Sequence, residues 1–306
     1  MRAGNHKSGK EMMSKPANKP PFRADHVGSL LRPAELTEAR AKWEAGTLSP
    51  EDLKAVEDKC ILDAIALQEG VGLKGITDGD FRRNDWFLDF MYSLEGIEKG
   101  GAGMYVPFSG GLDYYAPKTV FTGKVKCPEG GIMVDAFRFL KDHTKETAKI
   151  CIPAPAMFNT VMSESMLEDS PYDSIEEFWD DIGTGYAEAV QHLAAAGCTY
   201  LQIDDVNSAN LGDPKWQAVW QSQGRSPMDV CNNSIKLNNA ALDARPDGVT
   251  AAVHMCRGNY QSEYAAEGGY DVIAETYFNS MHVDAFFMEY DDARSGTFEP
   301  LRFMAG

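Results

Sequence analysis

The chain has 306 residues, 43% hydrophobic and 25% charged, a composition typical of a folded globular protein with one large core or two smaller ones. Its formal net charge of −17 argues against nucleic-acid and membrane partners, because surfaces that bind polyanions need clustered lysine and arginine. The six cysteines lie far apart without a CxxC pair, which favours a reduced, cytoplasmic enzyme over a disulfide scaffold.

Residues 1–20 are basic and polar and lack the apolar segment of a secretory signal, so they are predicted to form a disordered tail. We expect one folded catalytic domain over residues 21–306. No internal repeat and no linker to a second domain is found in it.

Beyond the tail, short apolar runs alternate with helical patterns, as in βα units built around a parallel sheet. The first predicted helix opens with Ser49 and Pro50, a good cap followed by a good first residue. A second begins with a capping box of Ser174 and Glu177 and ends at Gly197. The glycine-rich stretch 96–117 is expected to leave the rim of the barrel. The predicted strands are residues 22–30, 73–81, 119–125, 148–155, 199–205, 250–256 and 283–292.

Polar residues interrupt these runs at their carboxyl ends, where a (β/α)8 barrel keeps its active site. A doubly wound sheet obeys the same rule, but no GxGxxG follows the first run, which makes nucleotide binding less favoured. The residues concerned are His26 to Ser29, Asp78, Asp80, Asp204, Asp205, His254, Cys256 and Glu289.

The stretch "AVHMCRGNY" places His254 and Cys256 two residues apart. Side chains alternate along a strand, so both project to the same side, and Glu289 at the end of the next run could join them. Imidazole, thiolate and carboxylate are all zinc ligands. Two simpler interpretations stay open: a core histidine beside a buried thiol, and a salt bridge from Glu289 to Arg257 or Arg294.

Five stretches resemble the cobalamin-independent methionine synthases, in particular their short, single-barrel relatives. These stretches are "RADHVGSLLRPAEL", "GITDGDFRRNDW", "YLQIDDVNSANL", "HMCRGN" and "FFMEYDDARSGTFEPLRF". The resemblance implies a (β/α)8 barrel that uses Zn²⁺ to activate a thiol for alkyl transfer. It also implies that His254, Cys256 and Glu289 are zinc ligands.

The same resemblance implies how homocysteine binds. Gly28 and Ser29 would hold its carboxylate, and Asp80 and Asp204 its ammonium group, with Asp204 also the expected catalytic residue. Two carboxylates on one ammonium would select an amino-acid thiol through charge-assisted hydrogen bonds. The simpler alternatives are an ion pair of Asp80 with Arg82 or Arg83, and a helix cap for Asp204.

The sequence departs from the family pattern in two places. The family completes its zinc site with a second cysteine near the eighth strand, whereas this sequence has no cysteine after Cys256 and ends shortly after the seventh predicted strand. We therefore expect a barrel truncated after that strand, with a fourth zinc ligand that is not assigned. The family also carries a tryptophan after the fourth strand, where this chain offers only Phe158 as a stacking surface.

The leading prediction is a zinc-dependent S-methyltransferase that moves a methyl group from 5-methyltetrahydrofolate polyglutamate to homocysteine, giving methionine. One alternative is an alkyl transferase that uses another thiol, like the epoxyalkane:coenzyme M transferases. For a sulfonate-bearing thiol, arginines would be expected in place of Asp80 and Asp204. The other alternative is a non-catalytic zinc-binding remnant.

Overall fold

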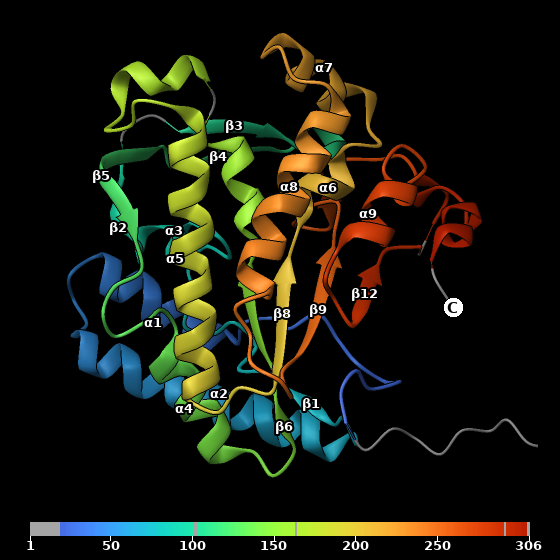
Figure 1. Cartoon of the computed structure of the whole chain (residues 1–306). Helices are drawn as coiled ribbons and strands as arrows, with labels where there is room; N and C mark the ends of the chain where they lie inside the picture. The colour runs from blue at the N-terminus through green and yellow to red at the C-terminus, as the bar shows by residue number, and fades with distance from the viewer. Residues whose placement is uncertain (1–18, 101–102, 163, 291, 305–306) are drawn as a thin grey trace, which may run out of the picture.

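The computed structural model describes residues 19–100, 103–162, 164–290 and 292–304, so most of the predicted tail lies outside the described residues. At its centre four parallel strands lie side by side in the order β12-β9-β8-β7 (Figure 1). They are β7 (Ile150–Pro153), β8 (Tyr200–Asp204), β9 (Thr250–Met255) and β12 (Ala285–Met288). A shorter parallel pair, β1 (Gly75–Ile76) and β6 (Thr147–Ala148), joins this sheet through Lys149, which connects β6 to β7.

Five of the seven predicted runs contain a strand of this parallel system, one run forms no strand, and one forms a strand outside the parallel system. Residues 22–30 form no strand, because side chains take their backbone carbonyls: Thr77 Oγ1 donates to Gly28 at 2.6 Å and Gln202 Nε2 to Val27 at 2.9 Å. Residues 119–125 do lie in a strand, but it pairs antiparallel with residues 95–99. Alternation of apolar residues does not distinguish these two kinds of pairing.

Helices cover the outside of the sheet; α8 lies in front of the sheet in the view of Figure 1, and α5 packs on α8 to its left. The α-helices are α1 (Ala34–Glu44), α2 (Pro50–Gly70), α3 (Leu88–Tyr92), α4 (Val134–His143), α5 (Ile175–Ala195), α6 (Val206–Asn210), α7 (Pro214–Ser222), α8 (Pro227–Leu242) and α9 (Ala274–Ser280). The 3-10 helices are η1 (Ser109–Gly111), η2 (Pro155–Thr160), η3 (Glu164–Asp169), η4 (Ala293–Ser295) and η5 (Glu299–Phe303).

The two helix starts predicted from capping residues are confirmed. Ser49 accepts a hydrogen bond from the Asp52 amide at 3.0 Å, and Pro50 is the first residue of α2. Ser174 accepts from the Glu177 amide at 3.2 Å at the start of α5. The carboxylate of Glu177 pairs with Lys124 rather than with Ser174, so only half of the predicted capping box forms.

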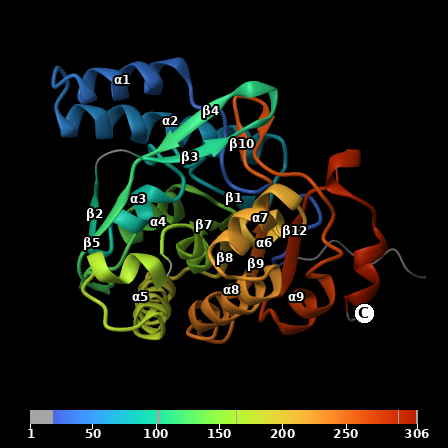
Figure 2. The ribbon, with the colours of Figure 1, turned by 90° about the horizontal axis from the view of Figure 1, so that it is seen from above.

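Within the excursion at residues 96–117, the antiparallel pair β3 and β4 lies beyond the carboxyl ends of the parallel strands, whereas β2 pairs antiparallel with β5, which packs on α5 (Figure 1). Viewed from above, β3 and β4 lie beside β10 (Figure 2), and the ring of Tyr260 in β10 contacts Phe108 and Tyr114 at centroid distances of 5.6 and 5.2 Å. The strands are β2 (Glu95–Lys99), β3 (Met104–Pro107), β4 (Asp113–Ala116), β5 (Thr119–Lys126), β10 (Asn259–Tyr260) and β11 (Glu263–Tyr264).

These elements confirm the predicted α/β class. Among the described residues, hydrogen-bonded pairing joins β12 to β9 and β1 to β6, but no pairing joins β12 to β1. Closure into a barrel therefore stays a prediction.

All six cysteines are free thiols. In the described part of the chain no helix has the length and apolar content that crossing a bilayer requires.

Candidate active site

The polar residues predicted for the site do lie at one end of the parallel sheet. Asp78 and Asp80 follow β1, Asp204 closes β8, and His254 lies one residue before the end of β9. The register pairs Asp204 with His254, so these two residues stand on adjacent strands. Because the carboxyl ends of parallel strands meet at one edge, this edge is the candidate active site.

The carboxylate of Asp80 already has two partners. Arg83 forms an ion pair with one oxygen, and the Ser29 hydroxyl donates to the other. Asp80 has a left-handed φ of 60°, and its amide donates to Asp78 at 3.0 Å, which fixes the loop after β1. The ion pair with Arg83, one of the simpler alternatives considered for Asp80, is therefore present.

Asp204 is 9% exposed and has a different environment. Gln202, two residues earlier on the same side of β8, donates to its Oδ1 at 2.7 Å. Burial and the nearby charge of Asp80 raise the pKa of Asp204 to about 7. None of the described cationic side chains forms an ion pair with it. The helix-cap alternative is wrong for this residue, because the cap of α6 is Asp205.

Contacts of Asp25 and His26 with buried side chains anchor the segment that contains Gly28 and Ser29. Lys149 is fully buried, and its Nζ lies 3.0 Å from Asp25 Oδ1, while His26 Nε2 lies 2.8 Å from Gln68 Oε1. Gly28 has a φ of 113°, and a Cβ at this position would lie 2.5 Å from the sulfur of Cys151. Only glycine fits there, so the backbone can approach the sheet closely.

His254 is prepared to act as a ligand through one nitrogen. Its Nδ1 lies 3.1 Å from the carbonyl oxygen of Phe287, which can only accept, so Nδ1 carries the proton and Nε2 keeps its lone pair. Burial lowers the pKa of His254 to about 4, which keeps the ring neutral. A histidine whose other nitrogen donates to a carbonyl is the usual form of a metal-ligating imidazole.

Cys256 and Glu289 lie just beyond the last residues of β9 and β12. The Cys256 sulfur accepts from the Gly258 amide at 3.4 Å. Glu289 accepts from Asn259 at 3.3 Å on Oε1, and its buried Oε2, 3.7 Å from Arg294, has no hydrogen-bond partner. The ion pair with Arg294, an alternative considered for Glu289, is therefore present.

The described residues contain no group of three or more His, Cys, Asp or Glu side chains gathered closely enough to hold a metal ion. His254, Cys256 and Glu289 are thus not assembled as a ligand set, and their role stays a prediction. Their chemistry nevertheless fits zinc: a neutral imidazole with a free lone pair, a thiol, and a carboxylate whose buried Oε2 lacks a hydrogen bond.

Sequence reasoning missed several residues around this edge. Gln202 lies two residues before Asp204, so strand alternation could have identified it. Lys149 is a lone cation in an apolar run, and such a residue needs a buried partner. Tyr270, whose hydroxyl contacts the ends of β9 and β12, gives no signal in the sequence because it lies in a loop far from both strands.

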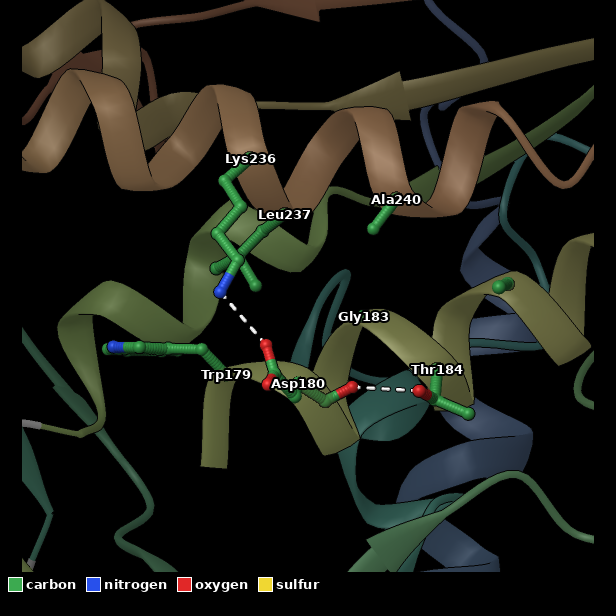
Figure 3. A pocket seen from close by; sticks show the side chains of 8 residues that line it. Trp179, Asp180, Gly183, Thr184, Lys236, Leu237 and Ala240 are labelled. Carbon is green, nitrogen blue, oxygen red and sulfur yellow. Dashed lines mark hydrogen bonds and ion pairs between the residues drawn. The ribbon is translucent and has the colours of Figure 1, made fainter. Parts of the chain in front are cut away.

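A separate hollow of about 310 Å³ lies on the outer surface between α5 and α8 (Figure 3). An ion pair of 2.9 Å between Lys236 and Asp180 spans it, and the Thr184 hydroxyl donates to the Asp180 carbonyl at 2.9 Å. Its apolar lining comes mainly from Trp179, Gly183, Ala187, Leu237 and Ala240. None of the predicted site residues lines this hollow, so it is not the candidate active site.

Proteins of known sequence and structure resemble the chain over most of its length. The uncharacterized protein YxjH of Bacillus subtilis is 37% identical over 292 residues, which cover 94% of this chain and 75% of YxjH. A 5-methyltetrahydropteroyltriglutamate–homocysteine methyltransferase of Thermotoga maritima is 28% identical over 263 residues, covering 84% of this chain and 33% of that protein.

Two solved structures share the fold. A Listeria monocytogenes protein, solved as a candidate vitamin-B12-independent methionine synthase, is 32% identical, with a TM-score of 0.67 over 90% of this chain and 74% of that one. A B12-independent methionine synthase of Shewanella sp. W3-18-1, solved with selenomethionine, is 19% identical, with a TM-score of 0.63 over 85% and 71%, and at this identity shows the fold alone. A model of the cobalamin-independent synthase catalytic domain matches residues 22–289. The chain therefore belongs to the cobalamin-independent methionine synthase family, of which it carries the catalytic domain.

Proposed function

We propose that this chain is a zinc-dependent methyltransferase that moves a methyl group from 5-methyltetrahydropteroyl polyglutamate to the thiol of homocysteine, giving methionine. The family supports methyl transfer to homocysteine. The observation that carries the proposal for this chain is the placement of Asp204, His254 and Glu289 at the carboxyl ends of three adjacent parallel strands. The family also supports a (β/α)8-type barrel as the frame of residues 21–306.

The proposed ligands of the zinc ion are His254 Nε2, the Cys256 sulfur and a Glu289 oxygen. When bound, zinc would hold the thiol of homocysteine as a thiolate, which is the reactive nucleophile. His254 contributes by staying neutral and by keeping Nε2 unprotonated through its bond to Phe287. The buried Oε2 of Glu289 has no hydrogen bond and faces Arg294 only at 3.7 Å, so coordination would give this oxygen a direct partner.

Asp204 is the proposed binding group for the ammonium of homocysteine. Arg83 balances Asp80, and Lys149 balances Asp25, so no cation compensates Asp204 among the described ion pairs. A bound ammonium would therefore be the cation that pairs with Asp204, and its charge would favour the ionised form of a carboxyl whose pKa burial and Asp80 raise to about 7. Ser29 and the backbone at Gly28 are proposed to bind the substrate carboxylate, and for this the Ser29 hydroxyl would turn its single proton from Asp80 to the substrate. The contacts of Gly28 with Thr77 and of Lys149 with Asp25 keep this segment in place.

The reaction itself needs positioning more than charge stabilisation. The sulfur forms a bond to the methyl carbon as the carbon–nitrogen bond of the folate breaks, and the electron pair of that bond stays on nitrogen, which then takes up a proton. No oxyanion develops, so the rate depends on holding the two substrates in line. For the donor, Phe158 is fully buried against Phe178 and Tyr186, so it offers no open surface on which a folate ring could stack.

One observation favours a second candidate, an alkyl transferase that uses a thiol with a sulfonate. Arg83 forms an ion pair with Asp80, a residue predicted to bind the substrate, and an arginine is the group that a sulfonate-bearing substrate needs. Its charge is already balanced by Asp80, however, which favours the amino-acid thiol. The third candidate, a non-catalytic zinc-binding remnant, is consistent with the absence of an assembled ligand set among the described residues.

A methyl-transfer assay tests the proposal. Zinc-loaded protein is incubated with homocysteine and methyl-13C 5-methyltetrahydropteroyltriglutamate, and the methionine formed is measured by mass spectrometry. We expect labelled methionine that disappears when zinc is removed with a chelator. Transfer only to 2-mercaptoethanesulfonate would support the second candidate. Zinc binding without transfer to either thiol would support the third.

A further inference from the structure

Tyr270 is a buried residue that connects the two strand ends of the proposed metal centre. It lies in the loop before α9 and is 1% exposed. Its carbonyl accepts from the amides of Ile273 and Ala274 at 3.1 and 2.9 Å, which anchors its backbone to the start of α9. Its side chain extends from there to the gap between β9 and β12.

The Tyr270 hydroxyl bridges β9 and β12 just beyond their last paired residues. The last register pair is Met255 with Met288. One residue further, the Glu289 amide donates to the hydroxyl oxygen at 3.1 Å, and the hydroxyl proton faces the carbonyls of Met255 and Glu289, each at 3.4 Å. A phenol oxygen thus stands where a direct backbone hydrogen bond would otherwise join the strands.

The ring of Tyr270 is itself held in place. The guanidinium of Arg257, which is fully buried, lies 4.5 Å from the ring centroid and donates to the Ser295 carbonyl at 3.2 Å. Burial raises the pKa of Tyr270 to about 12, so the hydroxyl keeps its proton at neutral pH. A buried cation on the face of an aromatic ring restricts the motion of both groups.

We infer that Tyr270 is a positioning residue: its hydroxyl sets the spacing between the strand ends that carry Cys256 and Glu289, and thereby the metal affinity of this centre. The Tyr270 hydroxyl contacts the backbones of Met255 and Glu289. Met255 precedes the proposed ligand Cys256, and Glu289 is itself a proposed ligand. The inference rests on the proposed function. Residues that orient metal ligands typically change metal affinity by about 10- to 100-fold when they are replaced.

The test compares two tyrosine-to-phenylalanine variants in the full chain. Tyr270→Phe removes the hydroxyl and keeps the ring. Tyr186→Phe is the matched control, because the Tyr186 hydroxyl is also buried but has no hydrogen-bond partner. For each protein, zinc affinity is measured by competition with a chromophoric chelator. The absorption bands of the Co²⁺-substituted protein report ligand geometry, and circular dichroism and thermal unfolding report folding.

We expect Tyr270→Phe to fold, to bind zinc at least 10-fold more weakly and to show shifted Co²⁺ bands, on the order of other residues that orient ligands. Tyr186→Phe should match the unmodified chain in both. A Tyr270→Phe protein with unchanged affinity and bands would overturn the inference alone. If Tyr270→Phe does not fold, Arg257→Met, which frees the ring, replaces it; weaker zinc binding supports the inference and unchanged binding overturns it. An unmodified chain that binds no metal would overturn the proposed metal centre, and this inference with it.

Discussion

The Nδ1 atom of His254 lies 3.1 Å from the carbonyl oxygen of Phe287, its register partner on β12. This hydrogen bond joins β9, which contains His254 and leads to Cys256, to β12, which leads to Glu289. It also decides which imidazole nitrogen is protonated, so that Nε2 is the atom left to bind a metal. The ligand chemistry of the site therefore depends on the pairing of β9 with β12.

Zinc binding should depend on Cys256. The purified chain should bind about one zinc ion, and Cys256→Ser should lose most of it, because a neutral hydroxyl is a poor substitute for a thiolate. Elemental analysis of dialysed protein measures this. Cys127→Ser is the control, since Cys127 is also a free thiol but lies at the end of a strand remote from the site. Equal zinc content in both variants would show that Cys256 is not a ligand.

Selectivity for an amino-acid thiol should depend on Asp204. Homocysteine should bind more tightly than a thiol of similar length without an amine, and Asp204→Asn should remove most of this preference. Losing a charged, buried hydrogen bond costs roughly 1.5 to 3 kcal/mol, or about 10- to 100-fold in affinity. Isothermal titration measures both thiols. Asp180→Asn, on the outer surface of α5, should leave the preference unchanged. Equal affinities in the unmodified chain would favour the coenzyme M type of substrate.

Gly28 should not tolerate a side chain. In Gly28→Ala the new Cβ would overlap the Cys151 sulfur in addition to adopting a positive φ, whereas Gly72→Ala has a φ of 91° and open space around it. The Gly72 variant should therefore lose only about 1 to 2 kcal/mol of unfolding free energy for backbone strain. Denaturant unfolding should show a larger loss for the Gly28 variant, and only this variant should weaken homocysteine binding. Identical losses would mean that close approach to Cys151 is unimportant.

The buried pair of Lys149 and Asp25 gives a prediction about stability. Lys149→Met leaves the Asp25 carboxylate buried without its cation, which should lower the unfolding free energy by about 3 to 5 kcal/mol. The double variant Lys149→Met/Asp25→Asn should regain more than half of that loss, because the uncompensated charge is gone. Urea unfolding of the single and double variants measures both values. A double variant no more stable than the single one would contradict the charge argument.

The sequence predicted the parallel strands well where a buried strand ends in polar residues. "YLQIDD" and "TAAVHMC" contain β8 and β9. An apolar run with β-branched residues and a polar end is typical of a buried parallel strand. The segment "FRADHVGSL" failed because Thr77 and Gln202 bind its carbonyls, and neither partner is near it in the sequence. Local patterns carry no information about such long-range bonds.

Within the site, the sequence predicted residue types better than their partners. Alternation placed His254 and Cys256 on one side of a strand, but only the structure shows that Arg83 is the partner of Asp80 and that Asp205 caps α6. From the sequence alone, the adjacent residues Asp204 and Asp205 cannot be assigned different roles. Their roles separate only when the strand fixes which side chain points to the sheet edge and which to the helix.

The most direct test is zinc X-ray absorption spectroscopy of the full chain, with and without selenohomocysteine. The central claim is that His254, Cys256 and Glu289 hold a zinc ion to which the thiol of the acceptor binds. Without substrate, the spectrum should show one sulfur and a mixture of nitrogen and oxygen neighbours. Addition of selenohomocysteine should introduce a zinc–selenium shell, absent in Cys256→Ser. A spectrum without a sulfur neighbour, or without selenium at saturating ligand, would contradict the claim.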